Sequence, residues 1–184
     1  MKGLTGKVAV VTGGSSGIGQ AIAIRLGEEG VDVAINYVGR PEGAEETKDA
    51  IEHGVDICMK QMAAAGTHPI LVAADVSQED QVDAMYRQVL EQYGRVDILI
   101  NNAGINTNSK RTHEYSVADW DRLMTVNLRG VFLNTRKGLA LMLPGPGSII
   151  NISSVLGLRG FWPGSARNGH GVYMPPVMKP PLFS

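Results

Sequence analysis

The stretch Thr12-Gly13-Gly14-Ser15-Ser16-Gly17-Ile18-Gly19 decides the fold that we predict for this chain. It directly follows the apolar run from Lys7 to Val11, which is typical of a strand buried on both faces of a parallel sheet. After it, apolar residues recur at helical spacing as far as Gly30, a suitable helix stop, and Val31 to Tyr37 predicts a second strand. A strand, a helix and a strand within about 30 residues have the size of a βαβ unit.

The glycines of this stretch have the spacing T-G-x-x-x-G-x-G. Gly13, Gly17 and Gly19 allow a tight turn, a close approach to a pyrophosphate and close packing of the helix on the sheet. The N-terminus of the following helix offers free N–H groups and the positive end of the helix dipole to an anion. Because the glycines lie between an apolar strand and an amphipathic helix, they predict dinucleotide binding rather than an ordinary glycine turn.

Strands and helices alternate along the rest of the chain. We expect strands at Ile70 to Asp75, Val96 to Asn101 and Ser148 to Ser153. We expect helices at Pro41 to Gly66, at Gln78 to Tyr93 with Ser77 as its cap, and at Ser116 to Leu143, which Pro144 ends. This alternation predicts an α/β fold, a doubly wound parallel sheet of the Rossmann type in strand order 3-2-1-4-5 with helices on both faces.

Polar residues gather where the predicted strands end. The clusters are Thr12 to Gly19, Asp75, Asn101 to Gly104, and Ser153-Ser154. Ligands of open parallel sheets bind at the carboxyl ends of the strands. We therefore expect the binding site at this edge of the sheet.

Length and composition exclude several other classes of protein. The chain has 184 residues, 43% hydrophobic and 19% charged, which is typical of a single globular domain. We expect a cytoplasmic protein without a membrane partner, because the chain has one cysteine, no signal peptide and no apolar run near the roughly 18 residues of a spanning helix. No metal site is expected, because the four histidines and Cys58 lack metal-ligand spacing. The basic residues of 122–184 are too scattered to predict a nucleic-acid partner.

Three further motifs accompany the glycine stretch: Asn101-Asn102-Ala103-Gly104, Asn127 within a predicted helix, and Ile149-Ile150-Asn151-Ile152-Ser153-Ser154. Together with Asp75 they resemble the short-chain dehydrogenase/reductase family over residues 4 to about 160. The resemblance implies an oxidoreductase that moves a hydride between NADP or NAD and a small carbonyl or alcohol, with a sugar such as glucose as one option. It also implies a homo-oligomer, which the departures described below leave open for this chain.

The resemblance assigns roles to individual positions. Those that would hold the pyrophosphate and the adenine ribose are Gly13, Ser15, Ser16, Gly17, Ile18 and Gly19. Asp75 and Val76 would border the adenine. The ribose would lie along Asn102, Ala103 and Gly104. Ser154 would bind the substrate oxygen, and Asn127 would hold a water of the proton relay.

The end of the second strand bears on the choice of nicotinamide cofactor. Family members specific for NAD carry an acid there, which binds both hydroxyls of the adenine ribose. Here Tyr37 occupies that position and the basic Arg40 follows, so a 2′-phosphate is not repelled. We expect NADP, or the use of both NADP and NAD.

The sequence departs from the family after Ser154. The family places a proton-donating tyrosine about 13 residues after the serine, and a lysine four further on that lowers the pKa of the tyrosine. Arg167 and Gly171 occupy those positions here. We divide the chain into a dinucleotide-binding Rossmann domain, 1–160, and an irregular tail rich in proline and glycine, 161–184, with the final strands of the family missing. Two interpretations follow: an active reductase, or a family member without turnover that retains at most nucleotide binding or subunit association.

Overall fold

The computed structural model describes residues 3–39, 67–106 and 112–154 of the chain. Within these ranges a parallel sheet has the strand order β3-β2-β1-β4-β5, as the sequence predicts. The strands are β1 (Val8–Val11), β2 (Asp32–Tyr37), β3 (Ile70–Ala73), β4 (Ile98–Asn101) and β5 (Ser148–Asn151). The helix expected at Pro41 to Gly66, the basic Arg40 and the tail lie outside the described residues.

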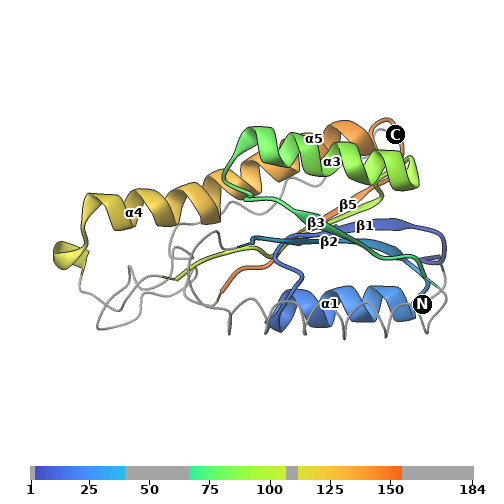
Figure 1. Cartoon of the computed structure of the whole chain (residues 1–184), viewed down its shortest axis with the longest axis horizontal. Coiled ribbons are helices and arrows are strands. Elements are labelled where there is room, and N and C mark those ends of the chain that lie inside the picture. The colour runs from blue at the N-terminus through green and yellow to red at the C-terminus, as the bar shows by residue number, and fades with distance from the viewer. Residues whose placement is uncertain (1–2, 40–66, 107–111, 155–184) are drawn as a thin grey trace, which may run out of the picture.

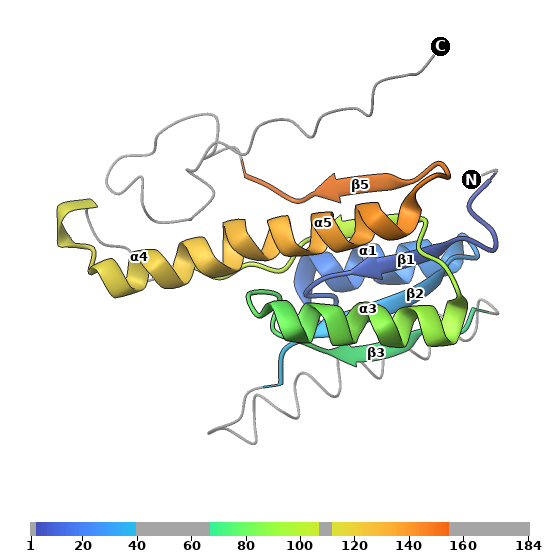
Figure 2. The same cartoon turned by 90° about the horizontal axis from the view of Figure 1, so that it is seen from above.

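Helices cover both faces of the sheet (Figures 1 and 2). One face is covered by α1 (Gly17–Glu28), and the other by α3 (Glu79–Tyr93) and α5 (Gly130–Met142). Right-handed crossovers between parallel strands produce this arrangement when the chain starts at a central strand and winds outward in both directions. The carboxyl ends of β1 and β4 consequently lie side by side, with Val11 paired to Ile100.

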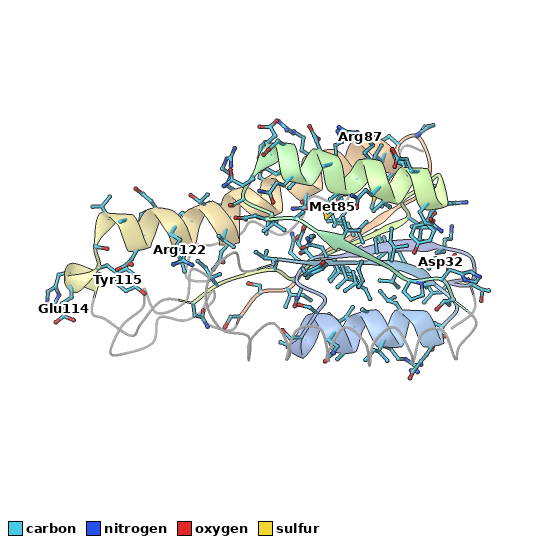
Figure 3. The ribbon with its side chains drawn as sticks, viewed as in Figure 1. Asp32, Met85, Arg87, Glu114, Tyr115 and Arg122 are labelled. Atoms are coloured by element: carbon cyan, nitrogen blue, oxygen red, sulfur yellow. The ribbon has the colours of Figure 1, made fainter. Side chains whose placement is uncertain are left out.

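Two apolar layers fill the space between the sheet and its helices. The layer beneath α3 and α5 includes Val10, Val72, Met85, Tyr86 and Leu99, and Figure 3 shows Met85 between its helix and the strands. The layer beneath α1 includes Val11, Ala23, Val31, Ile35 and Ile100. Successive side chains of a strand point to opposite faces, so each central strand contributes to both layers. This is why the run from Val8 to Val11 is apolar throughout, with each residue at most 3% exposed.

The long helix expected between Ser116 and Leu143 is built from three consecutive segments. They are α4 (Val117–Met124), the π-helical turn η2 (Thr125–Arg129) and α5, and the 3₁₀ turn η1 (Thr112–Glu114) precedes them. The expected cap is present, because Ser116 Oγ accepts a hydrogen bond from Asp119 N–H at 3.0 Å. Figures 1 and 2 show α4 projecting beyond the carboxyl edge of the sheet.

The prediction that Ser77 caps α3 is wrong. Gln78 occupies the N-cap position, and its side chain makes no cap hydrogen bond among the described residues. Ser77 N–H and Oγ both donate to Asp75 Oδ1, at 2.9 and 2.7 Å. Local turns of this kind compete with capping, and Glu79 and Asp80 instead bring negative charge to the first turn of the helix.

Three strands are shorter than the apolar pattern predicts. β3 stops at Ala73 rather than Asp75, β4 starts at Ile98 rather than Val96, and β5 stops at Asn151 rather than Ser153. Ala74, Val96 and Ile152 extend the apolar runs beyond the paired residues, because an apolar pattern reports burial and not where strand pairing ends. In the three described ranges no helix is long and apolar enough to cross a membrane, and no three His, Cys, Asp or Glu side chains form a metal-binding group.

Candidate functional site

Thr12 joins the loop after β1 to the end of β4. Its side chain is buried, and Oγ1 donates to the carbonyl of Ile100 at 3.2 Å. The same oxygen accepts from the backbone N–H groups of Asn102 at 2.9 Å and Ala103 at 3.0 Å. A hydroxyl can fill both roles because it has one donor and two lone pairs. Thr12 therefore fixes the ends of the two central strands side by side.

Asn102 provides a second link between the same two segments. Its side-chain Nδ2 donates to the carbonyls of Thr12 and Gly13, at 3.0 Å each. These bonds hold the start of the glycine stretch against the segment after β4. The structure thus brings together Gly13, Asn102 and Ala103, which the sequence placed in one site.

Gly13 and Gly19 have no room for a side chain. A Cβ on Gly13, where φ is +62°, would lie 2.9 Å from Ala103 Cα. A Cβ on Gly19 would lie 2.3 Å from the carbonyl oxygen of Gly13 and 2.4 Å from Asn102 Nδ2. These distances are far below van der Waals contact, so both glycines are needed for the loop to close on the start of α1.

The start of α1 has the properties of an anion site. Gly17 has φ of +54°, and no described atom lies within 4 Å of the position that its Cβ would take. The N-cap Ser16 makes no side-chain cap hydrogen bond within the described ranges, and no acid occupies the first turn. The N–H groups of this turn and the positive helix end therefore face the open side of the loop, where Ser15 and Ser16 also lie. Ile18 is 64% exposed at the same place.

Asp75 and Val76 form a rigid segment after β3. Asp75 N–H donates to Gln81 Oε1 at 2.8 Å, while Asp75 Oδ1 accepts the two bonds from Ser77, so Oδ2 takes no part in this turn. Val76 is buried, and its Cγ2 would lie 3.0 Å from a Cβ on Gly130. The start of α5 therefore packs closely on Val76 and fixes the segment expected to border an adenine.

The side chain of Asn127 forms two hydrogen bonds with the backbone of Ile105. Ile105 N–H donates to Asn127 Oδ1 at 2.8 Å, and Asn127 Nδ2 donates to the Ile105 carbonyl at 2.9 Å. The π-helical turn η2 places this side chain against the loop that contains Gly104, whose Cβ would lie 3.3 Å from Asn127 Oδ1. The side-chain amide thus supports the loop, and both of its polar atoms are engaged in doing so.

A pocket of about 340 Å³ lies between the glycine stretch and the ends of β4 and β5. Its lining residues are Ile18, Asn102, Gly104, Ile105, Asn106, Ile152, Ser153 and Ser154. The pocket joins Ser154, the residue expected to bind the substrate oxygen, to three residues expected to bind the cofactor. A site of this size between the glycine stretch and a serine pair can hold a small ring and a polar substituent.

Asn101 holds β5 in position beside this pocket. The side chain is buried, and Nδ2 donates to Asn151 Oδ1 at 2.8 Å and to Thr135 Oγ1 at 3.1 Å. It therefore connects β4 to both β5 and α5, just before the chain reaches Ser153 and Ser154.

The end of β2 closes the other side of the site. Tyr37 is half-buried and its carbonyl accepts from Ala74 N–H at 3.0 Å, while Val38 is 47% exposed. Positions 37–39 carry no acid, and Arg40 lies outside the described residues.

The model of the family described as short chain dehydrogenase matches residues 7–166. The chain belongs to the short-chain dehydrogenase family. The sequence motifs predict this membership, and the match confirms it. Solved structures of other short-chain dehydrogenases have a similar fold. The crystal structure of levodione reductase superposes on this short-chain dehydrogenase with a TM-score of 0.78 at 35% sequence identity, over 91% of this chain and 62% of that one.

Curated relatives of this short-chain dehydrogenase have several different names. Glucose 1-dehydrogenase 2 of Bacillus subtilis is 40% identical over 156 residues, which cover 84% of this chain and 56% of the relative. A 3-oxoacyl-acyl-carrier-protein reductase of Staphylococcus aureus is 40% identical over 155 residues, covering 84% and 58%. 3beta-hydroxysteroid dehydrogenase 1 of Eggerthella lenta is 43% identical over 154 residues, covering 83% and 54%. The chain therefore spans little more than half the length of these relatives.

Several residues that build the site were not singled out by the sequence. Asn36, Ile105 and Thr135 either hold the loops or line the pocket. A usable signal exists for Asn36, because it is a polar residue that directly follows the apolar run Val33-Ala34-Ile35 of a buried strand. No pattern in the sequence identifies Ile105 or Thr135, since their partners lie 22 and 34 residues away along the chain.

Proposed function

We propose that this chain binds NADP or NAD at the carboxyl edge of its sheet, as the nucleotide-binding part of a short-chain oxidoreductase. The observation that carries the proposal is the closed glycine loop, in which Gly13 and Gly19 leave no space for a side chain. A loop packed this closely brings backbone N–H groups, rather than side chains, to the surface that meets a phosphate.

The described residues fit an adenine dinucleotide along the whole edge. The pyrophosphate would lie at the positive end of α1 and contact Gly13, Ser15, Ser16, Gly17, Ile18 and Gly19. Asp75 and Val76 would border the adenine, and Asn102, Ala103 and Gly104 would lie along a ribose. When bound, the nicotinamide supplies the chemistry, a hydride given to or taken from a carbon atom.

The proposal favours NADP, with NAD as the second cofactor. A carboxylate at the end of β2 would repel a 2′-phosphate, and residues 37–39 are Tyr, Val and Gly. Arg40 adds a positive charge one residue further on. The expected preference for NADP follows from these charges alone.

The substrate class that we propose is a small carbonyl or alcohol. Ser154 lines the pocket together with Ile18 and Gly104, so a substrate oxygen bound by the serine would lie next to the cofactor segments. The relatives are named for a sugar, an acyl thioester and a steroid, so their names support carbonyl or alcohol chemistry and leave the individual substrate open.

A second candidate function is nucleotide binding without turnover. None of the five tyrosines of the 184 residues is followed four positions later by a lysine. A positioned general acid contributes about 10²- to 10⁴-fold to the rate, so these residues would reduce a carbonyl poorly without one. The same proposal includes a cytoplasmic location.

Calorimetric titration of the 184-residue chain with NADP and with NAD tests the binding. Saturable binding of either cofactor is expected, and its absence from the folded chain would contradict the proposal. Turnover is then followed at the NADPH absorbance with a sugar, a 3-oxoacyl thioester, a cyclic diketone and a steroid.

A chimera separates the two candidates. Residues after Ser154 are replaced by those of a short-chain dehydrogenase that carries a tyrosine 13 residues after the serine and a lysine four further on. We expect activity in the chimera and none above background in the 184-residue chain. Ordinary turnover by the chain itself would establish the active reductase.

A further inference from the structure

Asn36 is a buried polar residue near the carboxyl end of β2. It is 1% exposed and directly follows the buried apolar residues Val33, Ala34 and Ile35. Burying an amide costs free energy unless all of its polar atoms find partners. The side-chain amide of Asn36 should therefore have hydrogen-bond partners for both its oxygen and its nitrogen, and the structure shows such partners.

The bonds of Asn36 connect three segments. Its Oδ1 accepts from Gly13 N–H at 3.2 Å, and its backbone carbonyl accepts from Gly14 N–H at 2.8 Å. Its Nδ2 donates to the carbonyls of Ala74 at 2.9 Å and Val72 at 3.2 Å. The orientation of the amide follows from chemistry, because a backbone N–H can only donate and a carbonyl can only accept.

These three segments carry the two halves of the proposed adenosine diphosphate site. Gly13 and Gly14 belong to the phosphate loop, and Ala74 directly precedes Asp75 and Val76 on the adenine side. β2, which contains Asn36, lies between β1, from which the phosphate loop continues, and β3, from which the adenine segment continues. One side chain therefore spans from the phosphate loop to the end of β3.

We propose that Asn36 is a positioning residue for nucleotide binding, whose side-chain amide sets the spacing between the phosphate loop at Gly13 and the adenine segment after Ala74. The inference rests on the proposed function, because it names the residue that keeps the two halves of that site in register. Asn36 itself touches no bound group and acts through the backbone that it holds.

Asn36→Asp is the sharpest variant, because it changes the hydrogen bonding and almost nothing of the shape. An ionised carboxylate still accepts from Gly13 N–H, but it faces the carbonyls of Val72 and Ala74 without a proton to donate. Burial among carbonyls disfavours the charged form, so the pKa of the new carboxyl should rise. Its protonated form has one O–H and can donate to Ala74 again. Nucleotide affinity should therefore fall as the pH rises through that pKa, and recover on acidification.

The wild-type chain provides the reference for other titrating groups. On the segments that Asn36 bonds these are Tyr37 and Asp75, and the loop from Thr12 to Gly19 has none. The helices packed on the sheet carry further groups: Arg25 and Glu28 on α1, Arg136 and Lys137 on α5, and Glu79, Asp80, Asp83, Tyr86, Arg87, Glu91 and Tyr93 on α3. All of them are present in every variant, so a pH dependence that appears only in Asn36→Asp is assigned to the new carboxyl.

The experiment measures the affinity for NAD between about pH 6 and pH 8.5, a range in which its phosphates do not titrate, by calorimetry on the full 184-residue chain. We expect Asn36→Asp to bind about tenfold more weakly than wild type at the upper pH and within about threefold at the lower. The matched control is Asn134→Asp, a second buried asparagine whose Nδ2 bonds the carbonyl of Gly130 within its own helix, at 2.9 Å. It should lower the melting temperature without making the affinity depend on pH.

Two results overturn the proposal: wild-type affinity in folded Asn36→Asp at the upper pH, or an equal loss at every pH. If Asn36→Asp does not fold, the shorter Asn36→Ser replaces it, and wild-type affinity in that variant is the contradicting result. If the wild-type chain binds no NAD, the proposed function is wrong. Hydrogen exchange of backbone amides then tests, without any nucleotide, whether Asn36 holds the two segments in place. The amides of Gly14 and Ala74, which bond Asn36 and Tyr37, should then lose protection in Asn36→Asp but not in Asn134→Asp. Unchanged protection overturns the inference.

Discussion

The side chain of Asn127 forms a two-bond clamp on the backbone of Ile105. One bond runs from Ile105 N–H to Asn127 Oδ1 at 2.8 Å, and the other from Asn127 Nδ2 to the Ile105 carbonyl at 2.9 Å. The clamp joins the π-helical turn to the loop after β4. Its geometry leads to the first of five predictions.

Asn127→Ser should destabilise the chain. A serine is too short to bond both polar groups of Ile105, so at least one of them loses its partner, which costs about 1–3 kcal/mol. Urea unfolding followed by circular dichroism measures the free energy of unfolding. Asn106→Ser, at an exposed asparagine next in the chain to Ile105, should change it by less than about 0.5 kcal/mol. Equal stability of the two variants would show that the clamp contributes nothing.

Gly19→Val should abolish measurable binding of NADP and NAD. The new Cβ would lie 2.3 Å from the Gly13 carbonyl oxygen, so the phosphate loop must move, and overpacking costs about 1–3 kcal/mol besides. Gly145→Val is the matched control, because Gly145 is exposed after the end of α5, outside the site, and its Cβ would lie 3.4 Å from the nearest described atom, the carbonyl oxygen of Met142. Calorimetric titration compares the two variants. Undiminished binding by Gly19→Val would refute the location of the site.

Arg40→Asp should weaken the binding of NADP about tenfold more than that of NAD, because an acid at the end of β2 repels the 2′-phosphate. The ratio of the two dissociation constants, measured at low salt, reports the effect. Arg87→Asp makes the same charge change at an exposed position on α3, the helix on the opposite face from α1, and should leave the ratio unchanged. An equal loss for both cofactors in Arg40→Asp would mean that Arg40 does not read the phosphate.

Asp97 should make the stability of the chain sensitive to acid. Burial raises the pKa of this carboxyl, but hydrogen bonds from Arg95, from Val8 N–H at 3.0 Å and from Lys7 at 3.3 Å outweigh it and hold the pKa below its usual value. A lowered folded pKa adds stability above the unfolded pKa of about 3.9, and this stability disappears as the pH falls through the folded value. Asp97→Asn should therefore cost about 1–3 kcal/mol at neutral pH and progressively less below about pH 4.

Urea unfolding of the Asp97→Asn variant at a series of pH values measures this difference. Asp121→Asn, at an exposed aspartate on α4, serves as the control and should change the free energy of unfolding by less than about 0.5 kcal/mol at neutral pH. A constant difference between wild type and Asp97→Asn down to low pH would contradict the assigned direction of the pKa.

The 184-residue chain should associate in solution through α5 and β5. Phe132 and Leu139 on α5 are 57% and 45% exposed, Leu143 directly after the helix is 63% exposed, and Ile150 on β5 is 49% exposed. Apolar surface gathered in this way promotes association. Ile149 and Ile152, in contrast, are partly buried, because they pack against the two core layers.

Sedimentation velocity measures this association. The double variant Phe132→Lys and Leu143→Lys should shift the chain toward monomer, whereas Ala140→Lys, which adds charge to an exposed position of α5 outside this set of residues, should not. A monodisperse wild-type monomer would contradict the prediction.

The sequence by itself determined the order of the strands and the edge that carries the site. Apolar runs identify buried parallel strands, and the glycine spacing after Val11 identifies the first crossover. The right-handedness of crossovers then leaves few alternatives, of which the order β3-β2-β1-β4-β5 is the observed one. The motif residues Gly13 and Asn102 could be placed near this edge because they follow the ends of predicted strands, whereas Asn127 is assigned to the site only by the family resemblance.

Only the tertiary structure decided which atoms these residues bond. Asn102 reaches Gly13 across 89 residues of sequence, Asn36 reaches Ala74 across 38, and Asn127 turns its amide to Ile105 rather than to a free cavity. Ser77 likewise bonds Asp75 instead of capping α3. An amide or hydroxyl has several possible partners of similar strength, so its choice depends on which backbone groups the packed sheet leaves unpaired nearby, and local sequence does not encode that.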